Sequence, residues 1–191
     1  KIAIGNTGNV NRTSGHIFGN LQKYIPTGTS VVGTFEIGDA SVDNYTPISF
    51  SIASVNSAGN LTAKTISGDH PNIGSSTLGV SRSVNRYWSV TNTGVLFTNY
   101  DATFSFLTND VDALTNTSSL VCGKFDNPDW TYPTVGIKTA TTTQITGVTS
   151  FSDFQLAEEG CIDPDVPEVL ASFSTICVGD NSTISISEGN L

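Results

Sequence analysis

The sequence holds few side chains that could do chemistry, and one of them stands in an unexpected place. In the segment SVNRYWSVTNTG, residues 83–94, strand alternation places Arg86 on the same face as Val84, Trp88 and Val90. On such an apolar face a guanidinium could bind a ligand, act as an electrophile in catalysis, or anchor the fold. Because burying a guanidinium without an acceptor costs several kcal/mol, Arg86 must have a polar partner.

Three acidic residues stand beside predicted core strands and are candidate partners of this arginine: Asp39, Asp110 and Asp153. We expect Arg86 to be largely buried and bonded to a carboxylate or to backbone carbonyl oxygens. Arg86 and Trp88 are then structural anchors, with Arg86 fixing strand register and Trp88 filling the core. A nearby aromatic ring would add a cation–π interaction of about 0.5–2 kcal/mol.

The residue types that usually carry nucleophilic catalysis are not arranged for it. The sequence has no G-x-S-x-G segment, and His16 and His70 lie among Gly, Asn and Asp residues typical of loops. Acidic residues recur in the segments NDVDA and FDNPDW: Asp110, Asp112, Asp126 and Asp129. These acids could serve acid–base chemistry, but Asp also favours turns. We therefore predict turn or loop positions and no catalytic residue.

Calcium is the metal that these acids would suit, because it prefers several hard oxygen ligands. One candidate set is Asp110, Asp112 and Asp126. A second set lies in the acidic segment AEEGCIDPDVPE: Asp163, Asp165 and Glu168. Neither set matches an EF-hand loop. We favour solvated turns and a solvated acidic linker, with calcium as the alternative and no other cofactor expected.

Two aromatic residues in the proline-flanked segment NPDWTYP, Trp130 and Tyr132, could form a platform for a sugar. Asp126 and Asn127 stand close by in the sequence, and a tryptophan beside such polar groups suits a glycan. The alternative is that Trp130 caps one end of the fold, and the sequence favours this cap.

The three cysteines, Cys122, Cys161 and Cys177, show no C-x-x-C and no Cys/His metal spacing. Their odd number leaves one thiol unpaired, or paired with a residue outside the sequence. A disulfide between Cys161 and Cys177 is a candidate that spacing alone does not establish.

The composition resembles that of secreted and cell-surface proteins. Only 13% of the 191 residues are charged, against about 25% in typical domains, and Ser, Thr and Asn take their place. The formal net charge of -9 argues against nucleic acids and anionic membranes as partners, since no basic patch could neutralise phosphates. The sequence contains no run of about 18 apolar residues, so it predicts no segment that inserts into a membrane. Because the sequence lacks methionine, we expect a mature or excised fragment.

Alternation of apolar and polar residues predicts strands throughout the chain. In TPISFSI and ATFSFLT, the apolar Ile48, Phe50, Ile52, Phe104 and Phe106 alternate with polar or small residues. Turn residues recur about every 8–12 positions. We therefore predict an all-β fold, an antiparallel β-sandwich of jelly-roll or Ig-like type. The predicted strands are Gly15–Ile25, Ser30–Gly38, Thr46–Val55, Asn60–Ser67, Asn85–Thr93, Ala102–Leu107, Ser119–Phe125, Thr134–Ala140 and Thr143–Thr149.

The predicted domain boundaries follow changes in composition. Residues 1–160 form the sandwich, of which residues 1–30, rich in Gly and Asn, could instead end an upstream β region. Residues 161–168 form an acidic, proline-containing linker. Residues 169–191 hold two strands around a Gly-Asp-Asn turn, too few to bury a core of their own. They are the beginning of a truncated second β module.

Four segments follow one another in a characteristic order: FGNLQKYIPTG (Phe18–Gly28), FEIGDASVDNYTPISFSI (Phe35–Ile52), VNRYWSVTNTG (Val84–Gly94) and GVTSFSDFQLAEEG (Gly147–Gly160). Together they resemble a module of very large surface proteins of Bacteroidota, bacteria that export through the type IX secretion system. The resemblance spans about residues 15–160 and departs from the family's usual Val-Gly-Glu at Leu156-Ala157-Glu158. The tail FSTICVGDNSTISIS resembles the opening of an Ig-like or PKD-like repeat.

This resemblance implies a β-sandwich building block of an adhesin-like, extracellular surface polypeptide, and it implies no catalytic site. We therefore expect a non-enzymatic structural or adhesive module, placed in a stalk or at a binding tip, and a surface adhesin in gliding bacteria. Its expected partners are neighbouring β modules, surface glycans and, during export, the type IX secretion machinery. The alternative is a carbohydrate-binding module or an accessory domain of a secreted enzyme.

Overall fold

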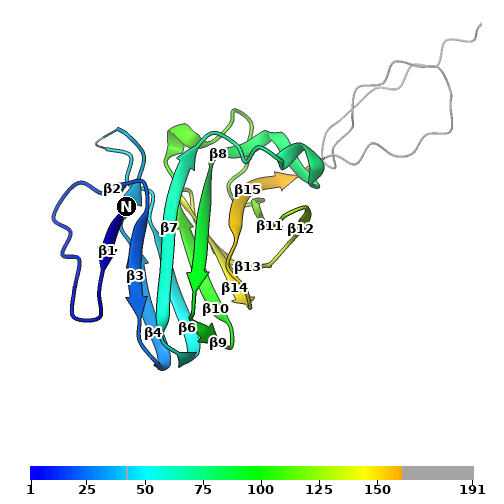
Figure 1. Cartoon of the computed structure of the whole chain (residues 1–191). Helices are drawn as coiled ribbons and strands as arrows, with labels where there is room; N and C mark the ends of the chain where they lie inside the picture. The colour runs from blue at the N-terminus through cyan, green and yellow to red at the C-terminus, as the bar shows by residue number, and fades with distance from the viewer. Residues whose placement is uncertain (42, 161–191) are drawn as a thin grey trace, which may run out of the picture.

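The structure, a computed structural model, describes residues 1–41 and 43–160, and strands dominate these residues (Figure 1). The strands form two large sheets that face each other as two layers, with one small sheet at their side. Two short 3-10 helices, η1 (Ile73–Ser75) and η2 (Thr108–Asp110), interrupt the loops. No helix in this described part is long and apolar enough to cross a membrane.

The first sheet has seven strands, whose spatial order differs from their order in the chain. In space they are β1 (Ile2–Ile4), β3 (Leu21–Ile25), β7 (Gly59–Ser67), β8 (Leu78–Thr93), β15 (Asp153–Glu159), β11 (Val121–Asp126) and β12 (Asp129–Thr131). Neighbouring strands are antiparallel, except that β1 runs parallel to β3. The late strand β15 therefore lies in the middle of the sheet, between β8 and β11.

The second sheet is antiparallel, and the small sheet is a parallel pair. The second sheet follows the order β13 (Thr134–Lys138), β14 (Thr142–Val148), β10 (Tyr100–Ser105), β6 (Ile48–Ser57) and β4 (Gly28–Phe35), with β9 (Leu96–Phe97) beside β6. The small sheet joins β2 (Ile17–Phe18) to β5 (Ile37–Gly38).

The core lies between the two large sheets, as the alternation predicted. On β6, Ile48, Phe50 and Ile52 are buried while the serines between them are exposed. Aromatic rings join the layers, because Phe104 of β10 packs with its ring centroid 5.1 Å from Trp88 of β8 and 5.1 Å from that of Phe154. The predicted all-β, antiparallel sandwich is thereby confirmed.

Several strand predictions were wrong in their extent, and β1, β9, β12 and β15 were missed. The predicted strand Ser30–Gly38 is divided into β4 and β5. The predicted strand Gly15–Ile25 is split into β2 and β3, and β8 begins at Leu78 rather than at Asn85. Strand β15 shows no alternation because residues 154–157 are buried on both faces of the sheet. Its inner face meets the core, and its outer face is covered by a loop.

The loop that covers the outer face joins β7 to β8, and we call residues 68–77 the covering loop. Ile73 of this loop packs with Leu78 and Ala157 in a second buried cluster, apart from the main core. Two hydrogen bonds of the buried Gln155 fix the loop to the sheet, since its Oε1 accepts from the backbone N–H of His70 at 2.8 Å and its Nε2 donates to the Val84 carbonyl at 2.8 Å. The sheet is thus covered on both faces around β15.

The predictions for the linker at residues 161–168 and the second module at residues 169–191 lie outside the described residues.

The burial pattern predicts opposite costs for two substitutions on neighbouring strands. Ile52→Ala removes a fully buried side chain and should lower the free energy of unfolding by about 2–5 kcal/mol. Val32→Ala, at a side chain that is 72% exposed on β4, should cost no more than about 1 kcal/mol. Urea unfolding followed by tryptophan fluorescence measures both values, and equal costs would contradict the assigned inner and outer faces.

Candidate functional site

Arg86 is completely buried, and each of its guanidinium nitrogens has an acceptor. Its Nε donates to Asp110 Oδ2 at 2.9 Å and its Nη2 to Asp110 Oδ1 at 3.1 Å, which makes a bidentate pair. Nη2 also donates to Asp39 Oδ2 at 2.7 Å, and Nη1 donates to Thr65 Oγ1 at 3.2 Å. The prediction of a buried arginine bonded to carboxylates is confirmed, with Asp39 and Asp110 as the partners.

The two acids that bind Arg86 are themselves held by loop backbone. Asp110 ends η2, and its Oδ2 accepts from the Leu107 N–H at 2.9 Å. Asp39 follows β5, and its carboxylate accepts from the Ser41 N–H and the Asn44 amide, each at 3.0 Å. One arginine on β8 therefore fixes two loops that are far apart in the chain.

The charges of this cluster shift the pKa values of Asp39 and Arg86. Burial raises the pKa of Asp39, but the hydrogen bonds from Arg86, Ser41 and Asn44 outweigh it and hold this pKa below its ordinary value of 3.8. Burial also lowers the pKa of Arg86, and the bonds to Asp110 and Asp39 outweigh that effect and raise it. Both shifts favour the charged forms, so the cluster is an ion network at neutral pH.

Trp88 fills the core beside Arg86, as the alternation predicted. Its ring is fully buried, and its Nε1–H donates to the Thr46 carbonyl at 3.1 Å. The indole N–H is therefore satisfied inside the core, and no part of this ring is available to a ligand.

The structure does not bring together Asp110, Asp112 and Asp126, the first set named for the calcium alternative. Asp110 binds Arg86, while Asp112 accepts from the Ser83 N–H at 2.9 Å and the Asn85 amide at 2.6 Å. Asp126 pairs with Lys124 on the same strand. No group of three or more acidic, His or Cys side chains in the described part of the chain could hold a metal ion. The other predicted set, Asp163 and Asp165, lies outside the described residues, as do Cys161 and Cys177.

Trp130 and Tyr132, the predicted sugar platform, instead hold the covering loop. The Trp130 Nε1–H is shared between the Asn72 carbonyl and Ser75 Oγ, at 3.2 Å each. The Tyr132 hydroxyl accepts from the Thr77 N–H at 2.7 Å, although its ring is 42% exposed. Trp130 lies close against the sheet because Gly123 has no Cβ, which would stand 2.8 Å from the indole.

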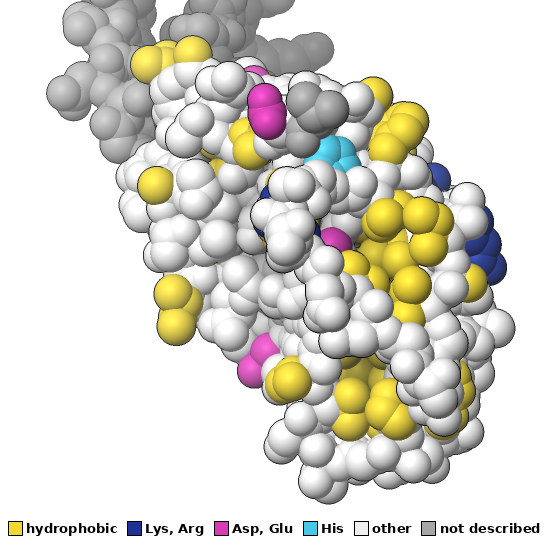
Figure 2. Space-filling view, turned by 90° about the vertical axis from the view of Figure 1, so that its left-hand side faces the viewer, with side chains coloured by type: hydrophobic (Ala, Val, Ile, Leu, Met, Phe, Trp, Pro, Cys, Tyr) yellow, Lys and Arg dark blue, Asp and Glu magenta, His cyan; other side chains and the backbone are white. Residues whose placement is uncertain are grey.

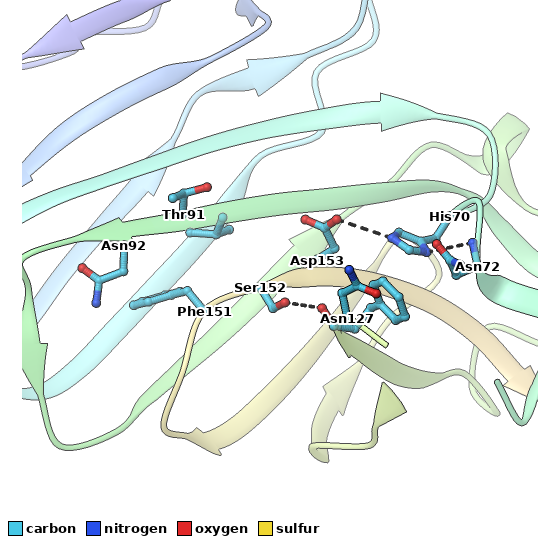
Figure 3. A pocket seen from close by; sticks show the side chains of 10 residues that line it. His70, Asn72, Thr91, Asn92, Asn127, Phe151, Ser152 and Asp153 are labelled. Carbon is cyan, nitrogen blue, oxygen red and sulfur yellow. Dashed lines mark hydrogen bonds and ion pairs between the residues drawn. The ribbon is translucent and has the colours of Figure 1, made fainter. Parts of the chain in front are cut away.

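His70 and Asp153 form a polar pair on the outer face of the first sheet (Figure 3). His70 Nε2 lies 3.4 Å from Asp153 Oδ2, and His70 Nδ1 accepts from the Asn72 N–H at 3.1 Å. The backbone donor fixes the tautomer, because Nδ1 must be unprotonated to accept. With both ring nitrogens engaged, His70 has no lone pair left with which to remove a proton from a substrate.

Ser152 stands next to this pair but does not complete a catalytic triad. Its hydroxyl donates to the Phe125 carbonyl, and its own carbonyl accepts from the Val90 N–H at 2.9 Å. A triad needs a hydrogen bond from the serine hydroxyl to the histidine, which is absent between these two described residues. Ser152 and His70 therefore have a structural role, which is to position Asp153 and the covering loop.

An open groove of about 650 Å³ lies beside His70 and Asp153. It runs between the covering loop, the end of β8, the turn between β11 and β12, and the entry to β15. Figure 3 shows Thr91, Asn92 and Phe151 at one end of this groove and His70, Asn72 and Asn127 at the other. Its volume falls within the usual range of ligand sites, about 300–1,000 Å³.

Sequence reasoning missed this groove, although it placed His70 in a loop. It named Asp153 as a candidate partner of Arg86, but Asp153 instead lies beside His70 on the outer face of the sheet. The groove residues come from four segments between positions 70 and 153 of the chain. No spacing motif could connect them, since they are brought together by the pairing of β15 with β8 on one side and with β11 on the other. The short segment from Gly147 to Asp153, with a glycine and several hydroxyl side chains, was the one local signal of an irregular entry to a strand.

Cys122 is a free, fully buried thiol. Burial raises its pKa far above the ordinary value, so it stays a protonated core residue rather than a nucleophile.

Comparison with models of known protein families, with curated proteins and with solved structures finds no significant match. The function is therefore inferred from the residues and their geometry.

Removal of the buried guanidinium should destabilise the fold strongly. Arg86→Met keeps much of the side-chain volume but leaves Asp39 and Asp110 buried without a counter-ion, which should cost about 3–5 kcal/mol. Lys64→Met on the neighbouring β7 removes a positive charge that makes no ion pair in the described residues, and should change stability by about 0.5 kcal/mol or less. Urea unfolding compares them, and a mild effect of Arg86→Met would contradict the anchoring role.

The depressed pKa of Asp39 predicts a loss of stability in acid. Because the unfolded chain takes up this proton first, the contribution of Asp39 is present above pH 3.8 and is lost as the pH falls through the lower pKa of the folded state. Below pH 3.8 the free energy of unfolding of the wild type should therefore fall more steeply than that of Asp39→Asn. Urea titrations at a series of pH values measure the two slopes, and parallel curves would count against this role of Asp39.

Proposed function

We propose that this chain is a non-catalytic structural and adhesive module of a large extracellular surface protein. The observation that carries the proposal is that the buried side chains able to take part in catalysis, Arg86 and His70, are used to stabilise the fold. Arg86 is saturated by two carboxylates and a hydroxyl, while His70 Nδ1 accepts a backbone hydrogen bond and its Nε2 faces the Asp153 carboxylate. This arrangement suits a scaffold, in which interior polar groups stabilise the fold and surface groups make the contacts with other molecules.

The surface supports an extracellular setting for this module. Only 13% of residues are charged, and hydroxyl and amide side chains take the place of the usual lysines and glutamates. Figure 2 shows one face on which charged side chains are sparse among uncharged polar groups and apolar patches. The resemblance to surface modules of Bacteroidota points the same way and adds neighbouring β modules and the type IX secretion machinery as partners.

The alternative is a carbohydrate-binding module or an accessory domain of a secreted enzyme. A sugar contact at Trp130 and Tyr132 is not favoured, because the polar atoms of both rings fix the covering loop. The groove beside Asp153 is a better candidate for a contact with another molecule, and it fits an adhesive module equally well.

The proposal predicts that the parent protein is exposed on the surface of the cells that produce it. A membrane-impermeant amine label and added protease should reach it equally in intact and in lysed cells. A cytoplasmic protein from the same cells, which should react only after lysis, is the control. Reaction of the parent protein only after lysis would overturn the proposed setting.

The adhesive role predicts a second result with the same cells. Deletion of residues 15–160 from the parent protein should reduce attachment to surfaces while the remainder is still labelled on intact cells. Unchanged attachment of cells that display the shortened protein would contradict the adhesive role and leave only a spacer role.

A further inference from the structure

We propose that the groove beside Asp153 is a binding site for an uncharged carbohydrate. This inference deepens the proposed function, since it names the ligand class through which an adhesive module would act. It rests on a set of polar groups that the fold brings together and that face the solvent of the groove, and on a fixed aromatic ring beside them.

Four polar groups in the groove keep hydrogen-bonding capacity that the described residues do not use. The side chains of Asn72, Thr91 and Asn127 make no hydrogen bond to the described residues, and Asp153 uses only Oδ2. Each amide offers both donors and an acceptor, the hydroxyl offers one of each, and Asp153 Oδ1 is an acceptor. Sugar hydroxyls are likewise donors and acceptors, so this mixture matches a polyhydroxyl ligand.

The charge of the groove argues for a neutral ligand. No lysine or arginine lines it, so nothing balances the charge of a sulfate, phosphate or uronic acid. Asp153 is its only carboxylate, and one of its oxygens is already engaged by His70. A calcium ion would need several oxygen ligands of this kind. Carbohydrate binding at this place is therefore expected to be independent of calcium.

Phe151 supplies an apolar surface that the fold holds still. Its ring stacks on Tyr100 with centroids 4.2 Å apart and an interplanar angle of 14°, and Phe97 packs against it at 5.1 Å. Tyr100 is itself fixed by a hydrogen bond from its hydroxyl to the Ser150 carbonyl at 3.1 Å. The part of Phe151 that lines the groove can receive the C–H face of a sugar ring without losing side-chain freedom on binding.

The polar groups are also positioned before any ligand arrives. Asp153 is oriented by His70, whose ring is packed between Tyr87, Phe125 and Trp130 at centroid distances of 5.0, 4.7 and 5.1 Å. The backbone of Asn72 is held twice, by His70 Nδ1 and by the Trp130 indole. Two members of this aromatic cluster, His70 and Phe125, also line the groove.

The test uses the full chain, residues 1–191, and a panel of neutral oligosaccharides: gluco-, manno-, xylo- and N-acetylated chito-oligosaccharides. Sulfated and uronic-acid oligosaccharides and a lysine-rich peptide are added as charged probes. Backbone amide NMR shifts locate binding, and calorimetry measures affinity with and without EDTA. We expect at least one neutral oligosaccharide to bind with a dissociation constant of about 1 mM or tighter and to shift groove residues.

Matched variants decide whether the groove carries the binding. Asn127→Ala and Asn72→Ala should each weaken it about tenfold, the loss that one or two hydrogen bonds represent. Asn109→Ala makes the same chemical change at an exposed position of η2, outside the groove, and should bind as the wild type does. Thermal unfolding of each variant, expected to match the wild type, shows that the fold is retained.

Four results would overturn the inference: no neutral oligosaccharide binds, the Asn127 and Asn72 variants bind as well as Asn109→Ala, only a charged probe binds, or EDTA abolishes binding. These failures are distinct from a failure of the proposed function. If surface labelling succeeds and no sugar binds, the module remains an extracellular scaffold and only the carbohydrate site falls.

Discussion

The fold depends on one constraint, the need to neutralise a guanidinium that is completely removed from water. Arg86 lies on the inner face of β8, where a lone positive charge would be strongly destabilising. Two carboxylates neutralise the guanidinium, and both belong to loops rather than strands. The requirement therefore reaches beyond the core, since it fixes the turn after β5 and the η2 turn against the same strand. Substitution of either acid would release the loop that it holds, while the other carboxylate would still balance the guanidinium.

On the outer face of the first sheet, polar side chains also hold a loop against the sheet, but through weaker interactions. Gln155 and His70 tie the covering loop to β15, and Trp130 closes the loop from the other side. Because the loop is held by several bonds of ordinary strength, its order does not depend on any single one. The groove results from this arrangement, since the edge of the covering loop forms one of its walls. Its polar groups are side chains that are not used to hold the loop.

Much of the fold could be predicted from the sequence, because alternation reports directly on a strand with one wet face. Ile48, Phe50 and Ile52 followed that rule, and the misfit of Arg86 correctly indicated buried carboxylates. Strand β15 was not predicted because it is buried on both faces, so its sequence does not alternate between apolar and polar residues. The groove was missed for a different reason. Its parts are joined by the pairing of β15 with β8 and with β11, and pairing between distant strands leaves no mark in local composition.

The central place of β15 has a consequence for how the module would respond to tension. Strand β15 ends at Glu159, so a pull applied at residue 160 acts along this strand. That strand is hydrogen-bonded to β8 on one side and β11 on the other, and the Gly160 N–H adds a bond of 2.6 Å to the Thr77 carbonyl. The load is thus shared by two ladders in shear, which must slide together, whereas an edge strand would peel away one bond at a time.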